Sequence, residues 1–290
     1  MNFVLMLTGY KGLLFLQKIN KNPKFVVCYD NGELDGEIFE KIKKICVDKK
    51  ISFFEQKNLI GLEDNLEIVE KVFLVGWQYI LHKNHEKLVI FHDSYLPERR
   101  GFSPTIDALM SRSPYLSASA IEPHEGSLEP DLGDIYCRLK KEIKYPITLK
   151  EAFEIVVDLY VFIFNKIINE NISPQTIDYN NSTFSVWKDK EDMKIDWHRS
   201  SEDILNKIMI LGYPYNNAFC LYKSQEVRIK KAELVSDLNI TNRADNVGKI
   251  WKIENGCPLI ICGSGILKLN KVVKHDGADV VFNKLRRRFR

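Results

Sequence analysis

The first half of the chain alternates short apolar runs with segments of helical periodicity. The runs are residues 3–7, 25–28, 51–54, 72–75 and 88–91. Between them, apolar residues recur every three or four positions, as in Leu13, Leu16 and Ile19. Such alternation predicts parallel strands joined by crossover helices. We therefore expect an α/β fold, a Rossmann-like and mostly parallel sheet with flanking helices, which binds ligands beyond the carboxyl ends of its strands.

The second half changes character after Pro146. Thr148 is positioned to cap a long helix that reaches about Asn169, and a second helix is expected from Ser201, its predicted cap, to Leu211. Five short strand-like runs follow, at residues 218–222, 227–235, 247–254, 259–262 and 266–272. They predict a small OB-like β-barrel, with Asn255-Gly256 as a hairpin turn. The predicted domains are residues 1–171 and 201–290, joined by a linker over 172–200.

The composition limits the class of protein. The chain has 290 residues, a net charge of +3, and 45% hydrophobic and 28% charged residues, as expected for a globular protein. It contains no apolar run of 18 residues, so no membrane span is expected. Its six cysteines include no CxxC pair, which favours a reducing cytoplasm and argues against a zinc site. The low charge makes a nucleic-acid partner unlikely, and the Arg-rich end, Lys284 to Arg290, is expected to be solvated.

One histidine stands at the point where chemistry is expected. His92 follows the buried run 88–91 directly, and Ser94, Pro97 and the pair Arg100-Gly101 come soon after it. This is the carboxyl edge of the predicted sheet, where catalytic groups collect.

A second polar segment precedes the strand-like run 135–139. Residues 124–134 contain four carboxylates, the last of which is Asp134. If both segments end at the same sheet edge, Asp134 and His92 face one another and suit general acid–base chemistry. The segment does not fit the spacing of a calcium loop.

These motifs resemble the folate-dependent formyltransferases, which include methionyl-tRNA, glycinamide ribonucleotide and sugar N-formyltransferases. The family pattern is Asn-x-His-x-Ser-Leu-Leu-Pro, then Arg-Gly, then a loop that ends in Gly-Asp. Its matches in this chain are His92, Ser94, Leu96, Pro97, Arg100-Gly101 and Gly133-Asp134. Weaker matches at Asp196-Trp197, residues 227–233 and residues 263–269 extend the resemblance to the C-terminal barrel. The chain departs from the pattern at Ile90, which stands in place of the Asn.

The resemblance implies a formyl transfer from 10-formyltetrahydrofolate, as co-substrate, to a primary amine, without a metal. His92 would donate a hydrogen bond to the carbonyl oxygen, Asp134 would pair with His92, and Ser94 is the nearest candidate to replace the missing Asn. The residues implied in folate binding are Gly76, Trp77, Gln78, Tyr79, Ile80, Leu128, Asp131 and Gly133. The residues expected to contact the acceptor are Arg99, Arg100 and Gly101.

We expect the acceptor to be a small molecule, a nucleotide-linked amino sugar of polysaccharide or glycan biosynthesis, and a homodimer is possible. Three alternatives stay open. The first is methionyl-tRNA formyltransferase, which the barrel and the Arg-rich end favour, although the N-terminal half lacks an evident basic insertion. The second is a binding or regulatory homologue impaired by Ile90. The third is a hydrolase of the formyl folate.

Overall fold

The computed structural model describes residues 1–30, 36–56, 66, 68–79, 81 and 85–290. The chain forms two compact units, the first made of residues 1–144 and 151–187 and the second of residues 145–150 and 188–290. The segment 172–200, expected as a linker, is thus divided between the two units. No helix in the described ranges is long and apolar enough to cross a membrane.

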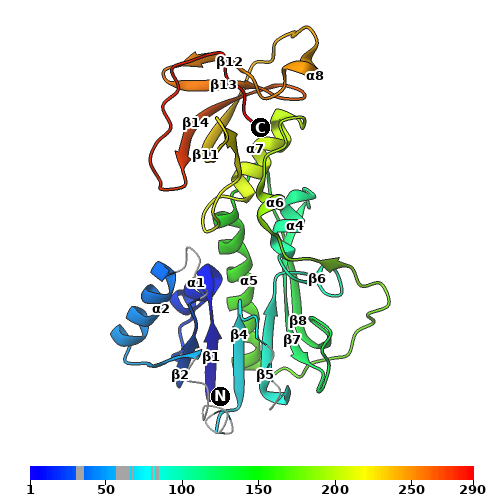
Figure 1. The fold of residues 1–290 in the computed structure, drawn as a ribbon. Helices are drawn as coiled ribbons and strands as arrows, with labels where there is room; N and C mark the ends of the chain where they lie inside the picture. Colours follow the sequence, from blue (N-terminus) through cyan, green and yellow to red (C-terminus); the bar gives the residue numbers. More distant parts are fainter. Residues whose placement is uncertain (31–35, 57–65, 67, 80, 82–84) are drawn as a thin grey trace. The chain divides into compact units, whose positions relative to one another are not determined.

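The first unit is built on a seven-stranded sheet of order β3-β2-β1-β4-β5-β7-β8 (Figure 1). Its five parallel strands are β1 (Phe3–Leu7), β2 (Phe25–Cys28), β3 (Ser52–Glu55), β4 (Lys71–Val75) and β5 (Leu88–His92). Each begins and ends within one residue of an expected run, so the predicted parallel sheet is confirmed. Their carboxyl ends meet at one edge, because every pair among them is parallel.

Two antiparallel strands complete this sheet beside β5. They are β7 (Tyr115–Pro123) and β8 (Gly133–Glu142). The run 135–139 predicted β8, whereas β7 was missed, because its centre consists of the small residues Ser117 to Ala120 and forms no apolar run. Ser119 is fully buried, and its hydroxyl donates to the carbonyl of Ser94 at 2.6 Å, which satisfies a polar group inside the sheet.

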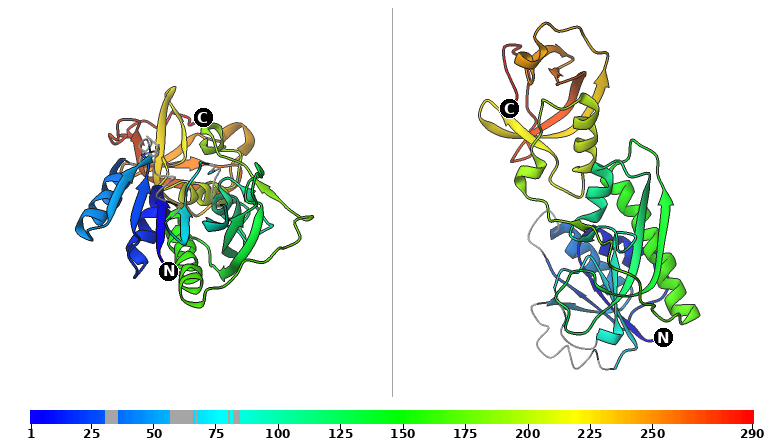
Figure 2. Two further views of the ribbon diagram at one scale, coloured as in Figure 1. Left: turned by 90° about the horizontal axis from the view of Figure 1, so that it is seen from below. Right: turned by 90° about the vertical axis from the view of Figure 1, so that its right-hand side faces the viewer.

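Helices cover one face of the sheet with aromatic side chains. Figure 2 shows α5 (Leu149–Glu170) running along the sheet, and Phe164 of this helix packs on Phe3 and Phe73 with ring centroids 5.3 and 4.9 Å apart. Phe15 of α1 (Gly9–Lys18) reaches the same cluster. Among the described residues of this unit, the other elements are α2 (Gly36–Asp48), η2 (His85–Lys87), α4 (Pro104–Met110) and the short pair β6 (Arg100–Gly101) with β9 (Phe184–Ser185).

The second unit is a five-stranded antiparallel sheet of order β10-β11-β14-β13-β12. Its strands are β10 (Phe219–Tyr222), β11 (Gln225–Val235), β12 (Ile250–Glu254), β13 (Cys257–Ile261) and β14 (Ile266–Lys274), and its helices are α6 (Lys190–Met193), α7 (Ser201–Ile210) and α8 (Arg243–Asn246). Asn255 and Gly256 join β12 to β13 with φ angles of 51° and 78°, so the expected hairpin is confirmed. The cap of α7 is Ser200, one residue earlier than expected, since its side chain accepts from the amide of Asp203.

The backbone at the end of the chain belongs to this sheet, whereas the side chains of residues 284–288 are exposed as expected. The backbone of Arg290 exchanges two hydrogen bonds with Leu221 in β10, and the amide of Phe289 donates to the carbonyl of Gly248 just before β12. Phe289 is 2% exposed and stacks on Tyr222, with ring centroids 4.9 Å apart. The last residues therefore bridge the two outer strands of the sheet, while the arginine side chains extend from a segment whose backbone is fixed.

Candidate active site

A cavity of about 440 Å³ lies at the carboxyl edge of the parallel strands in the first unit. Its wall includes residues that follow β4, among them Trp77 and Tyr79, and the end of β5 with Ile90 and His92. The loop 127–132 closes another side. Its volume lies within the range of small-molecule sites, and its place is the one expected for a ligand of such a sheet.

His92 is buried at the end of β5 with both ring nitrogens engaged. Its Nε2 lies 2.8 Å from the carbonyl oxygen of Arg99. Because a carbonyl only accepts hydrogen bonds, Nε2 carries a hydrogen. Nδ1 lies 3.3 Å from Oδ1 of Asp131. With its hydrogen on Nε2, the imidazole turns its second nitrogen toward this carboxyl group, so Nδ1 and Oδ1 together form a site that can accept a proton.

Asp131 is held in place by the loop that carries it. Its Oδ2 accepts from the amide of Gly101 at 2.7 Å, which leaves Oδ1 for His92. Gly101 has a φ of +95°, and a side chain there would come within 2.6 Å of the Ser185 carbonyl oxygen. Only glycine therefore allows the chain to present this amide to Asp131 while pairing with β9.

The expected pairing of His92 with Asp134 is wrong. Asp134 lies inside β8, opposite Glu122 on β7, so the pleat of the sheet and not the loop fixes its direction. Its Oδ1 accepts from His124 at 3.2 Å and from Thr176 at 2.9 Å, and these hydrogen bonds hold the pKa of Asp134 below its usual value. Asp131, expected only to contact the folate, takes the place beside His92.

Three other expected site residues do not line the cavity. The Arg100 side chain is buried and donates to the Pro130 carbonyl and the Glu129 carboxylate, both at 2.9 Å. It therefore fixes the loop that carries Asp131 and is not available to an acceptor. Ser94 is 1% exposed, away from the cavity wall. Gly133 allows β8 to approach β7, since a Cβ there would lie 2.1 Å from the Glu122 carbonyl oxygen.

The segment after β4 fits a flat, polar-edged ligand. Gly76, Trp77, Gln78, Tyr79 and Leu128 line the cavity as expected, and Ile80 lies outside the described residues. The indole Nε1 of Trp77 is buried without a hydrogen-bond partner, so the wall holds a donor that a bound ring acceptor would satisfy. Tyr79 is 51% exposed, so it presents an aromatic surface to a ligand.

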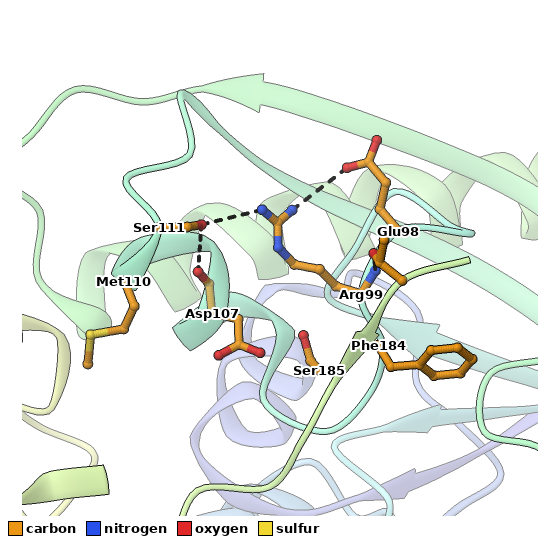
Figure 3. Close-up of a pocket in the computed structure, with 8 residues that line it drawn as sticks. Glu98, Arg99, Asp107, Met110, Ser111, Phe184 and Ser185 are labelled. Atoms are coloured by element: carbon orange, nitrogen blue, oxygen red, sulfur yellow. Dashed lines mark hydrogen bonds and ion pairs between the residues drawn. The ribbon is translucent and has the colours of Figure 1, made fainter. Parts of the chain in front are cut away.

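Arg99 lines a separate hollow of about 690 Å³ (Figure 3). Its guanidinium lies between Glu98 and Ser111, at 3.7 and 3.4 Å, and both contacts are long for charged partners. Phe184 stands at the rim, 59% exposed, with its ring turned away from the guanidinium. The carbonyl oxygen of Arg99 also accepts the hydrogen bond from His92. Arg99 therefore connects the hollow, through its side chain, with the candidate site, through its backbone.

Sequence reasoning gave one group at this site the wrong role and missed another. Asp131 was recognised as a site residue, but nothing in the acidic loop distinguishes its direction from that of Asp134. Lys11 lines the cavity and forms an ion pair with Asp93, and its only signal is its place just beyond the carboxyl end of β1. In the described part of the chain, His, Cys, Asp and Glu residues form no cluster that could hold a metal ion.

Comparisons with known proteins agree with this architecture. Residues 188–287 match the family described as "Formyl transferase, C-terminal domain". The methionyl-tRNA formyltransferase of Caldicellulosiruptor saccharolyticus is 25% identical over 298 residues, which cover 96% of this chain and 93% of that protein.

Two solved structures share the fold. The N-formyltransferase of Helicobacter canadensis, in complex with folinic acid and dTDP-3-aminofucose, has a TM-score of 0.62 at 16% identity and covers 93% of this chain and 99% of its own. HypX of Aquifex aeolicus has a TM-score of 0.63 at 13% identity and covers 97% of this chain, which spans 46% of HypX. At these identities the two structures support the fold alone. The match to the C-terminal domain and the full-length relative support the folate-dependent formyltransferase family for this chain.

Proposed function

We propose that the chain transfers the formyl group of 10-formyltetrahydrofolate to the primary amine of a nucleotide-linked amino sugar. The observation that carries the transfer is the His92–Asp131 pair, with Nδ1 3.3 Å from Oδ1, in the wall of the 440 Å³ cavity. Trp77 and Tyr79 supply the unpaired indole donor and the aromatic surface for the folate ring. When bound, the folate supplies an activated formyl group; the protein residues orient it and move the protons.

The proton balance of the transfer fits this pair. As the acceptor nitrogen forms its bond to the formyl carbon, the amine loses a proton, and as the bond from that carbon to N10 breaks, N10 gains one. The His92–Asp131 pair receives the first proton and returns one to N10, so it ends in its initial state. The Arg99 carbonyl keeps the hydrogen on Nε2, which leaves Nδ1 and the carboxylate as the proton-exchanging atoms.

The hollow beside Arg99 supports a small anionic acceptor. The contacts of Arg99 with Glu98 and Ser111 are long, which leaves its guanidinium with donors for a phosphate group. The volume of the hollow suits a nucleotide-linked sugar. The charge of the catalytic part also favours a small acceptor over RNA, because residues 1–187 contain 22 Lys and Arg against 26 Asp and Glu. A net negative part repels a polyanion more strongly than it repels a single diphosphate.

A second candidate acceptor is methionyl-tRNA. Residues 188–290 contain 20 Lys and Arg against 13 Asp and Glu, so the small total of +3 hides a C-terminal segment that carries +7. That segment matches the C-terminal formyl transferase domain, and the relative in Caldicellulosiruptor saccharolyticus is a methionyl-tRNA formyltransferase. A basic domain supplies salt-dependent affinity for phosphates of any nucleic acid.

The test is product analysis by mass spectrometry. The full chain is incubated with 10-formyltetrahydrofolate and, in parallel, with dTDP- and UDP-linked amino sugars, with methionyl-tRNA at matched salt, and with buffer alone. A gain of one formyl group on a sugar nucleotide is the expected result. Faster formylation of methionyl-tRNA would replace the proposed acceptor by the second candidate, release of formate alone would indicate a hydrolase, and the absence of any product would overturn formyl transfer itself.

A further inference from the structure

Ile90 stands where the family pattern has Asn, so β5 offers no side-chain donor there for the negative charge that develops during formyl transfer. Attack on the formyl carbon places charge on the formyl oxygen, and such charge is stabilised by preorganised donors. Ile90, two residues before His92, is apolar and packs on Leu96 and Ile121. His92 itself donates from Nε2 to the Arg99 carbonyl, and its Nδ1 faces Asp131. Neither the Ile90 position nor the imidazole therefore has a donor to spare for this oxygen.

Lys11 is the single Lys or Arg among the described residues that line this cavity. It lies in the first turn of α1, just after β1 ends, so its backbone is placed at the same sheet edge as His92. The side chain is 21% exposed and passes over the Phe153 ring, with the ammonium nitrogen 5.3 Å from the centroid. The ammonium is thus partly desolvated, which strengthens its interaction with any charge in the cavity.

A buried network fixes the ammonium in this place. Asp93, the residue after His92, forms an ion pair with Lys11 and accepts a hydrogen bond from the Tyr160 hydroxyl. It also accepts from the Thr105 hydroxyl at 2.9 Å. Burial alone would raise the pKa of Asp93, but the charge and hydrogen bond of Lys11 and the Tyr160 hydroxyl outweigh burial and hold that pKa below its usual value. The carboxylate is therefore ionised, and four segments of the first unit converge on it to hold one lysine.

We propose that Lys11 is a catalytic residue, whose ammonium donates a hydrogen bond to the formyl oxygen as negative charge develops there, and that Asp93 is its positioning residue. The inference rests on the proposed formyl transfer. Lys11 remains protonated throughout, because the protons that the reaction moves pass through His92 and Asp131. The chain thereby supplies from α1 the donor that Ile90 removes from β5.

Kinetics of matched variants give the first test. Lys11→Met is expected to lower kcat by about 10²- to 10³-fold, the usual effect of removing one such donor, with the KM for 10-formyltetrahydrofolate within about threefold. Lys18→Met is the control, since Lys18 lies on the same helix and pairs with Asp158 at 2.5 Å away from the cavity. Lys11→Arg keeps the charge and is expected to retain more activity than Lys11→Met.

Loss of folding is separated from loss of the donor by a double variant. Lys11→Met leaves the buried Asp93 charge without its cation, whereas Lys11→Met combined with Asp93→Asn makes the site neutral. The double variant is expected to have a melting temperature close to that of the wild type and to stay inactive. In a Lys11→Cys variant, alkylation with 2-bromoethylamine rebuilds an ammonium group. The kcat of the alkylated variant is expected to be at least tenfold higher than that of the same variant before alkylation. Wild-type protein treated in the same way controls for the native cysteines.

A readout independent of activity is chemical labelling. Trinitrobenzenesulfonate modification of each lysine is measured by peptide mass spectrometry, with and without 5-formyltetrahydrofolate, which carries the formyl group on N5. Bound folate is expected to protect Lys11 severalfold and to leave Lys18 unchanged. Equal labelling of Lys11 in both samples, or a Lys11→Met variant with wild-type kcat, would overturn the role of Lys11 while formyl transfer stands. A wild type that formylates no amine would instead remove the proposed function, and this inference with it.

Discussion

The two compact units differ in where their charged side chains lie, in the interior of the first unit and outside the core of the second. In the first unit, charged side chains are drawn into the interior, where Asp93, Arg100 and Asp131 are bonded to partners around one cavity. In the second unit, the core is made of apolar and aromatic side chains such as Phe289, and the excess positive charge, +7 over residues 188–290, lies outside that core. We therefore expect the chemistry to reside in the first unit, with the second contributing a sheet that has a basic exterior.

The largest effect is expected at the His92–Asp131 pair. His92→Ala or Asp131→Asn should lower kcat by about 10²- to 10⁴-fold, because each removes one partner of the proton exchange. Asp134→Asn should change kcat less than about threefold, since Asp134 bonds to His124 and Thr176 outside this pair. Steady-state kinetics of the three variants decide the matter. If Asp134→Asn were inactive and Asp131→Asn active, Asp134 and not Asp131 would be the partner of His92 in catalysis.

The next effect concerns the end of the chain. Phe289→Ala should lower the free energy of unfolding of the second unit by about 3–5 kcal/mol, because it empties a fully packed aromatic site. Deletion of residues 285–290 should unfold the same unit, since the bridges to Leu221 and Gly248 are lost. Scanning calorimetry measures both, with Val281→Ala, at a 78% exposed position, as the control. A truncated chain with an unchanged transition would show that the terminal residues do not close the sheet.

A smaller effect separates the two candidate acceptors. Lys284→Glu with Arg286→Glu changes the charge of residues 188–290 from +7 to +3 at exposed positions. Turnover of a nucleotide-linked sugar should change less than about twofold, because one diphosphate responds weakly to distant screened charges. Turnover of methionyl-tRNA should fall about tenfold or more if the basic surface binds it. Initial rates at two salt concentrations distinguish these outcomes.

The smallest effect is the pH dependence contributed by Asp93. Its folded pKa lies below the unfolded value of 3.8, so its stabilisation is complete above about pH 4 and is lost as the pH falls through the lower folded pKa. The free energy of unfolding, measured with urea, should therefore fall more steeply with decreasing pH in the wild type than in Asp93→Asn over this acidic range. Parallel acid profiles of the two proteins would contradict an ionised Asp93 in the folded state.

Much of the architecture follows from local sequence. The five parallel strands and α5 were predicted within one or two residues, because fully buried strands and amphipathic helices impose simple periodicities on apolar residues. The turn at Asn255-Gly256 was equally predictable, since few residues adopt two consecutive positive φ angles. His92 was found for a related reason, as a polar group placed directly after a buried strand stands at the sheet edge.

What the sequence determined by itself is therefore the set of elements, the edge at which they meet, and the family. Only the tertiary structure decided which carboxylate faces His92, which cation approaches the cavity, and whether the Arg-rich end is free. Asp131 and Asp134 are three residues apart in similar surroundings, and the Gly101 amide, 30 residues away, selects the first. Lys11 meets Asp93 across 82 residues, and Phe289 meets Tyr222 although four strands, β11 to β14, separate them in the sequence. Such pairings depend on which distant segments pack together, and no local pattern of hydrophobicity or charge records that.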